Sequence, residues 1–211
     1  MPSPDDATTR EVPTPGGPAR VHLHLARDAR AALVLGHGAN GGVGSRDLVA
    51  VTGVALSEGV GVALVEQPYR VAGRRAPPRA PQLDAAWTAV LDDLRAGELA
   101  GLALVVGGRS SGARVACRTA AATGAVGVLC LAFPLQPPAG RGGAPRPSRL
   151  PELDAVEVPT LVVQGERDPF GMPSPGGLRV VVEVSADHSL RSDLGAVSAA
   201  VRTWLTAVVP G

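Results

Sequence analysis

The apolar residues of this chain fall into short, nearly continuous runs separated by longer segments of mixed character. Runs rich in valine, leucine and alanine lie at residues 21–26, 31–35, 60–66, 102–106, 126–132, 160–164 and 178–184. Most are apolar at successive positions, which is typical of strands buried on both faces of a parallel sheet. We therefore predict a strand at each run, with the first strand antiparallel to the others.

Between these runs, apolar residues recur at helical spacing. One such stripe follows Pro81, includes Trp87 and ends at Gly97, and another, which includes Trp204, covers residues 194–208. Both stripes are the core-facing sides of amphipathic helices, and residues 113–122 also read as a helix. Strands that alternate with helices predict a doubly wound, mostly parallel α/β sheet in a single domain.

The first residues lack this patterning. Residues 1–19 are rich in proline, threonine and glycine, and they have neither a basic start nor the apolar segment of a signal peptide. We predict a flexible tail at 1–19 followed by one domain at 20–211. No apolar run approaches the roughly 18 residues of a membrane span, so we expect no membrane partner.

Charge and cysteine content narrow the function further. The formal net charge is +1, which is not the strongly basic footprint of a nucleic-acid-binding protein. The only cysteines are Cys117 and Cys130, each in a predicted buried element. They indicate buried thiols in a cytoplasmic protein without a disulfide framework.

The first candidate for chemistry directly follows the strand at 102–106. The segment GGRSSG at residues 107–112 has the pattern G-x-S-x-G with Ser110 at its centre, and a predicted helix begins at residue 113. Between a strand and a helix, this pattern forms a sharp, strained turn that lifts the serine hydroxyl above the sheet edge. Because 27 glycines can produce the pattern by chance, the prediction depends on what accompanies it.

Two further residues follow in the order expected of a hydrolase triad. Asp168 lies just after the strand predicted at 160–164, and His188 lies just after the strand predicted at 178–184. The chain order Ser, Asp, His is the one found in hydrolases built on such a sheet. Because the carboxyl ends of parallel strands meet at one edge, we expect Asp168 and His188 to lie near Ser110.

An oxyanion hole is predicted in the segment GHGANGGVG at residues 36–44, after the strand at 31–35. Two backbone amides would hold the substrate oxygen. One belongs to Ala39 in this turn, and the other belongs to Ser111 at the start of the helix that follows the nucleophile.

The same segment has a second interpretation. Gly36, Gly38 and Gly41 satisfy G-x-G-x-x-G after a strand, and Glu66 ends the next strand. A dinucleotide-binding unit is therefore an alternative, although it leaves the serine, aspartate and histidine above unexplained.

Two segments rich in arginine, proline and glycine, at residues 68–81 and 134–151, have too few apolar residues for a helical lid. We predict little or no lid over a shallow, open pocket. The arginines of these segments are expected to form a solvated loop surface; alternatively, Arg70 or Arg74 reaches the site and binds a carboxylate or phosphate of the substrate. Arg109 would do the same or pack against the nucleophile turn. Asn40, Arg70 and Arg109 are the candidate substrate-binding residues.

His22 and His24 lie on one face of the first strand, an H-x-H spacing that some metal sites use. No cluster of carboxylates accompanies them. We expect no metal and no cofactor.

Taken together, five segments resemble a known family. They are the HGAN turn at residue 37 and the segments at 66–75, 107–112, 133–138 and 162–171. They look like the small α/β-hydrolase-fold family often called dienelactone-hydrolase-related, whose members include testis-expressed and chromatin-complex subunit relatives. The resemblance covers residues from about 20 to 209, and it implies Ser110 as nucleophile, Asp168 as acid and His188 as base.

The sequence thus predicts a cofactor-free serine hydrolase that acts on a small ester or thioester. An interaction scaffold that keeps the hydrolase fold without catalysis is the alternative from a different class, and the dinucleotide-binding protein is a third. The acyl group, the leaving group and the oligomeric state stay open.

Overall fold

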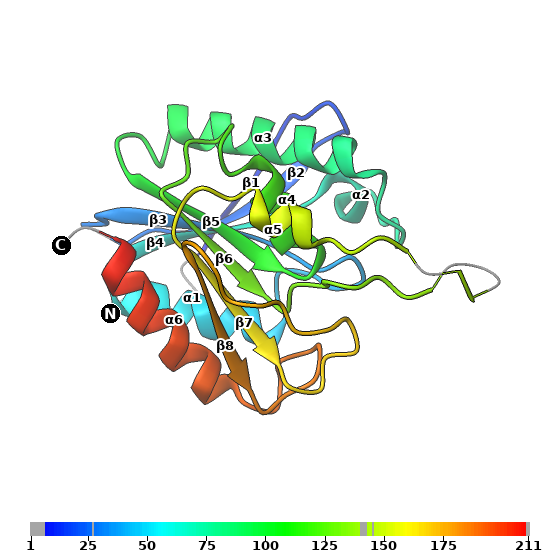
Figure 1. Cartoon of the computed structure of the whole chain (residues 1–211). Coiled ribbons are helices and arrows are strands. Elements are labelled where there is room, and N and C mark those ends of the chain that lie inside the picture. The colour runs from blue at the N-terminus through cyan, green and yellow to red at the C-terminus, as the bar shows by residue number, and fades with distance from the viewer. Residues whose placement is uncertain (1–6, 27, 140–142, 145, 210–211) are drawn as a thin grey trace.

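The computed structural model describes residues 7–26, 28–139, 143–144 and 146–209. Strands and helices alternate along most of this part of the chain (Figure 1). In chain order the elements are β1 (Thr8–Val12), β2 (Ala19–His24), β3 (Ala31–Gly36), α1 (Arg46–Ser57), β4 (Val60–Glu66), α2 (Pro68–Val71), α3 (Ala80–Ala96), β5 (Ala103–Arg109), α4 (Ser111–Thr119), β6 (Gly127–Leu131), α5 (Leu150–Asp154), β7 (Thr160–Gly165), β8 (Arg179–Val184) and α6 (Leu194–Val208).

The described strands form one eight-stranded sheet in the order β1-β2-β4-β3-β5-β6-β7-β8. Strands β3 to β8 pair in parallel, whereas β2 is antiparallel to both β1 and β4. The predicted doubly wound, mostly parallel sheet is confirmed. The strand predicted at 21–26 is β2, and its antiparallel direction is also confirmed.

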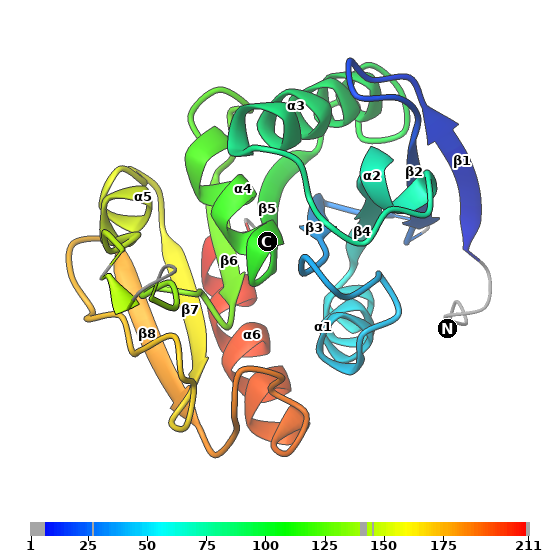
Figure 2. The same ribbon diagram turned by 90° about the vertical axis from the view of Figure 1, so that its right-hand side faces the viewer.

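Helices cover both faces of the sheet, with α3 and α4 on one side and α1 and α6 on the other (Figure 2). Side chains alternate between the faces along each strand. In β5, Leu104 and Val106 pack with the α3 and α4 face, and Val105 packs with the α1 and α6 face. Trp87 and Trp204 lie in these two cores, as their helical spacing predicts.

The prediction of a flexible tail over residues 1–19 is wrong for residues 8–12, which form β1. This strand pairs with β2, and Val12 at its end is buried. Arg10 makes ion pairs with Asp93 and Glu98, which ties β1 to α3 and the segment after it. The strand is short and mostly polar, so its stability comes from these tertiary contacts, which no local pattern reveals. Residues 1–6 lie outside the described part of the chain.

The two arginine-rich segments contain only short helices, the four-residue α2 and the five-residue α5. Among the described residues, neither segment builds a helical lid. No helix in that part of the chain is both long and apolar enough to cross a membrane.

Helix α4 packs against β3 at unusually short range. A Cβ placed on Gly112 in α4 would lie 2.3 Å from the Gly36 carbonyl oxygen. Gly108 in β5 meets the same oxygen, because a Cβ there would lie 2.4 Å from it. Backbone therefore packs on backbone here, and the glycines allow the helix after Ser110 to approach the sheet this closely.

We expect opposite effects from the same substitution at two helical glycines. Gly112→Ala should lower the free energy of unfolding by about 1–3 kcal/mol, since its methyl group overlaps the Gly36 carbonyl. Gly53→Ala, at an exposed position of α1 with nothing within 4 Å of the new Cβ, should raise it by roughly 0.5–1 kcal/mol. Urea unfolding of both variants measures this. A Gly112→Ala protein as stable as the wild type would contradict the close packing of α4.

Candidate active site

Ser110 lies in the turn between β5 and α4, with backbone angles φ 52° and ψ −105°. A positive φ is unusual for a residue with a side chain and indicates a strained turn. The Ser110 amide donates to the Leu131 carbonyl at 2.9 Å, which holds the turn against the neighbouring strand β6. This is the strand–turn–helix context that a nucleophile elbow requires.

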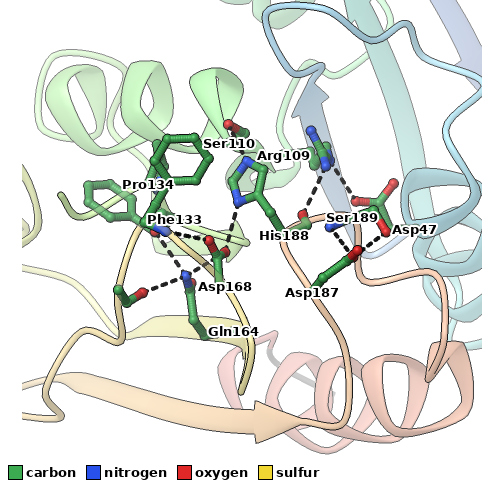
Figure 3. Close-up of polar contacts among 12 residues, drawn as sticks. Asp47, Arg109, Ser110, Phe133, Pro134, Gln164, Asp168, Asp187, His188 and Ser189 are labelled. Atoms are coloured by element: carbon green, nitrogen blue, oxygen red, sulfur yellow. Dashed lines mark hydrogen bonds and ion pairs between the residues drawn. The ribbon is translucent and has the colours of Figure 1, made fainter. Parts of the chain in front are cut away.

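His188 bridges Ser110 and Asp168 (Figure 3). Its Nε2 lies 3.0 Å from Ser110 Oγ, and its Nδ1 lies 2.7 Å from Asp168 Oδ2. The Asp168 side chain is fully buried, and His188 retains 18% of its exposure. The structure thus places all three predicted side chains in one hydrogen-bonded chain, with a buried acid at one end and an accessible hydroxyl at the other.

The carboxylate of Asp168 is itself held in place. Gln164 Nε2 donates to Asp168 Oδ2 at 2.8 Å, and the Phe170 amide donates to Oδ1 at 2.9 Å. Gln164 is completely buried, and its Nε2 also lies 3.1 Å from the Phe133 carbonyl and 2.9 Å from the Gly171 carbonyl. No motif in the sequence predicts this role for Gln164. Its one signal is a polar residue at the end of the apolar run that forms β7.

Phe170 also contacts His188. Its ring lies 4.5 Å from the His188 ring, measured between centroids, with the planes tilted by 60°. This contact and the Asp168 hydrogen bond restrict the imidazole on one face and at one nitrogen. The Nε2 atom is left directed at Ser110.

The candidate oxyanion amides lie beside the nucleophile. Ala39 and Ser111 both line the cleft that contains Ser110 and His188. Ser111 is the first residue of α4, so its amide has no acceptor within the helix. Two backbone amides beside an open cleft are the groups from which an oxyanion hole can be built.

His37 shapes the turn that carries Ala39. Its Nδ1 lies 2.8 Å from the Gly38 carbonyl, and its Nε2 accepts from the Gln67 amide at 3.1 Å. These partners require a neutral ring with the proton on Nδ1, and burial lowers the pKa of His37, which favours the same neutral form. Tyr69 Oη donates to the Ala39 carbonyl at 2.9 Å, which fixes the turn from its other side.

The three candidate substrate-binding residues lie in different places. Asn40 lines the cleft of about 440 Å³ around Ser110. Arg70 lies in α2, outside the described residues that line this cleft. Arg109 lines the cleft, but its Nη2 donates to the His188 carbonyl at 2.9 Å and its Nε lies 3.4 Å from Asp47 Oδ2. The geometry favours packing at the elbow as the role of Arg109.

The glycine-rich segment does not have the geometry of a dinucleotide site. In such a site the glycines lead directly into a helix, whereas α1 begins only at Arg46. The space at Gly38 is occupied by the Arg109 guanidinium, because a Cβ on Gly38 would lie 2.8 Å from Nη1. Glu66 pairs with Arg20 at 3.5 Å.

The remaining titratable candidates lie apart from the cleft. His22 and His24 lie in β2, where burial lowers the pKa of both. Across the described residues, no group of three or more histidine, cysteine, aspartate or glutamate side chains is placed to hold a metal ion. Cys117 and Cys130 are free thiols and are buried, as predicted.

Comparisons with known proteins agree with this fold. No curated protein matches the sequence. Among solved structures, the lidless serine hydrolase XC6422 from Xanthomonas campestris superposes with a TM-score of 0.75 and 18% identity over 100% of this chain and 99% of that one. Est1E from Butyrivibrio proteoclasticus gives 0.77 at 14% identity over 95% and 98% of the two chains. Dienelactone hydrolase from Anabaena variabilis gives 0.76 at 17% identity over 97% and 99%.

Because these identities are low, the structural neighbours establish only the fold. The family is established by the sequence, because a family model described as an alpha/beta hydrolase domain matches residues 29–193. That match covers the elbow, the oxyanion turn, Asp168 and His188. The chain therefore belongs to the α/β-hydrolase domain family.

Proposed function

We propose that this protein is a serine hydrolase that cleaves a small ester or thioester through an acyl-enzyme. The observation that carries the proposal is the chain of hydrogen bonds from the buried Asp168 carboxylate through His188 to the hydroxyl of Ser110, which lies at a strained turn. This arrangement activates a serine hydroxyl, because the imidazole can accept its proton while the carboxylate stabilises the resulting cation.

Each step of the reaction has a residue in position. Ser110 Oγ attacks the carbonyl carbon as its proton passes to His188 Nε2, and the amides of Ala39 and Ser111 stabilise the negative oxygen. When the carbon–oxygen or carbon–sulfur bond breaks, His188 returns the proton to the leaving group. Water, deprotonated by the same nitrogen, then releases the acid from Ser110.

The cleft supports a small substrate. Its volume of about 440 Å³ is at the lower end of the range for ligand sites, and the described segments beside it form no lid. The structural neighbours support the proposal, since they include an esterase, a carboxylesterase, a dienelactone hydrolase and a serine hydrolase whose description states that it has no lid.

A catalytically silent interaction scaffold is the competing function. A scaffold gains nothing from a buried acid supported by two hydrogen-bond donors, nor from a strained serine. Labelling of the nucleophile therefore separates the two functions, because a fluorophosphonate reacts only with an activated serine.

Wild-type protein should react with a fluorophosphonate at Ser110 and hydrolyse a short p-nitrophenyl ester. Ser110→Ala should do neither while keeping the wild-type circular dichroism spectrum. Ser57→Ala, which removes a hydroxyl from the end of α1, is the matched control and should behave as the wild type. Mass spectrometry of the labelled peptide identifies the modified residue, and labelling on Ser111 would show that the nucleophile is misassigned.

Substitutions of two neighbouring carboxylates, Asp168 and Glu166, test which residue is the acid of the triad. Asp168→Asn keeps the shape of the side chain but removes the charge that stabilises the imidazolium, so kcat should fall by about 10³- to 10⁴-fold. Glu166, which is exposed and pairs with Arg167, serves as the control, and Glu166→Gln should leave kcat unchanged. A nearly silent Asp168→Asn would contradict the triad.

Gln164 should act as a positioning residue for the acid. Gln164→Met keeps most of the buried volume but removes the donor to Asp168 Oδ2, so kcat should fall about 10-fold with KM unchanged. Thr160→Val, which removes a buried hydroxyl hydrogen bond at the other end of β7, should lower stability without lowering kcat. Equal kcat in the two variants would assign Gln164 a purely structural role.

A further inference from the structure

The cleft beside Ser110 is lined by positive charge without a carboxylate to match it. Its described lining includes Arg109, Arg114 and Arg149 but no aspartate or glutamate. Guanidinium groups in a cleft normally have anionic partners, either in the protein or in a ligand. The partners of each arginine therefore show where the unbalanced charge lies.

Two of the three arginines are neutralised within the protein. Arg109 forms its ion pair with Asp47 behind the cleft. Arg114 makes a two-point contact with Glu152, with Nε 2.8 Å from Oε2 and Nη2 2.5 Å from Oε1. Neither guanidinium is free to serve as the principal partner of a ligand anion.

Arg149 is different, because no carboxylate of the described chain lies within ion-pair distance of it. Its Nη1 donates to the Pro134 carbonyl at 2.9 Å, and its backbone amide donates to the Leu135 carbonyl, also at 2.9 Å. The Nη1 contact holds the side chain at the cleft wall, and among the described residues no acceptor lies within hydrogen-bond distance of its Nε and Nη2 donors.

Most of the groups around Arg149 disfavour its positive charge. Partial burial lowers the pKa of Arg149, and the nearby guanidinium groups of Arg114, Arg118 and Arg146 lower it further, whereas Glu152 raises it. Arginine nevertheless remains charged at neutral pH, so the Arg149 guanidinium is a cation in an environment that disfavours positive charge. An anion bound here would remove that unfavourable interaction.

The space beside Arg149 extends away from the nucleophile. A second hollow of about 420 Å³ shares Arg114 and Arg149 with the Ser110 cleft. Its wall also contains Arg146 and Glu152, and the Glu152 carboxylate is paired with Arg114 and Arg118. Gln136 Nε2 donates to the Arg146 carbonyl at 2.8 Å, which ties this segment to the residues that follow β6. Arg149 therefore lies at the junction of the two hollows, with Ser110 on one side.

We propose that Arg149 binds an anionic oxygen group, a carboxylate or a phosphate, at the end of the substrate remote from the bond that Ser110 attacks. The inference rests on the proposed hydrolase function and adds the substrate class, a small ester or thioester that carries a negative charge. Arg146, which also lines the second hollow, strengthens the attraction for that charge.

Matched pairs of substrates test the proposal. The mono-p-nitrophenyl esters of succinate, glutarate and adipate present a carboxylate at increasing distance from the reacting carbonyl, and each has a neutral counterpart in which an isopropyl group replaces that carboxylate. For at least one chain length, wild-type kcat/KM should favour the anionic ester by roughly 10- to 100-fold, the range expected for one charge-assisted contact. The preference should weaken as salt is added.

Variants assign that preference to Arg149. Arg149→Gln should remove it by raising KM for the anionic ester while leaving the neutral ester unchanged, and Arg149→Lys should retain part of it. Arg202→Gln, which removes a charge from α6 outside both hollows, is the control and should match the wild type. Equal kcat/KM for anionic and neutral esters, or an Arg149→Gln variant that loses both equally, would overturn the proposal.

Direct binding separates this inference from the proposed function. Isothermal titration of glutarate and of inorganic phosphate into wild-type protein should show binding that Arg149→Gln weakens about 10-fold or more, and the better ligand identifies the anion. If neither ester is hydrolysed and Ser110 takes no label, the proposed function fails, while binding dependent on Arg149 would still support the anion site. Activity on neutral esters without such binding would reject the anion site alone.

Discussion

The close approach of α4 to β3 is the constraint on which the candidate site depends. Where Gly112 meets the Gly36 carbonyl there is no room for a methyl group, and Gly108 faces the same oxygen. The chain can leave β5 and enter α4 within this space only through a sharp turn, and Ser110 occupies that turn at φ 52°. The strain at Ser110 is therefore a consequence of how closely the helix packs on the sheet.

Much of the architecture follows from local patterns in the sequence. Buried parallel strands are nearly uniform in hydrophobicity, so the runs that became β3 to β7 are visible without a structure, whereas β8 is partly exposed and is visible through its run of valines. The positions of Ser110, Asp168 and His188 follow from a second regularity, since each comes just after a strand and parallel strands end at one edge. These residues can be proposed as a group because the fold brings such ends together.

The features that the sequence did not reveal depend on contacts between distant segments. Strand β1 is short and polar and is stabilised by Arg10 pairing with Asp93 and Glu98. Gln164 gained its role from the carbonyls of Phe133 and Gly171, which no spacing indicates. The sequence pointed to Arg70, Arg74 and Arg109 as candidates near the substrate, and of Arg70 and Arg109 only Arg109 lines the cleft. Arg149 is distinguished by the positions of the carboxylates around each guanidinium, which depend on the folded structure.

Arg109 couples Ser110 and His188 through one side chain. It directly precedes Ser110 at the end of β5, its Nη2 donates to the His188 carbonyl at 2.9 Å, and its Nε lies 3.4 Å from Asp47 Oδ2 in α1. The loop that contains His188 is therefore tied to the strand that leads into Ser110. A displacement of that strand would move Ser110 Oγ and His188 Nε2 together, so the distance between these two atoms is less sensitive to such a movement than if each residue were held independently.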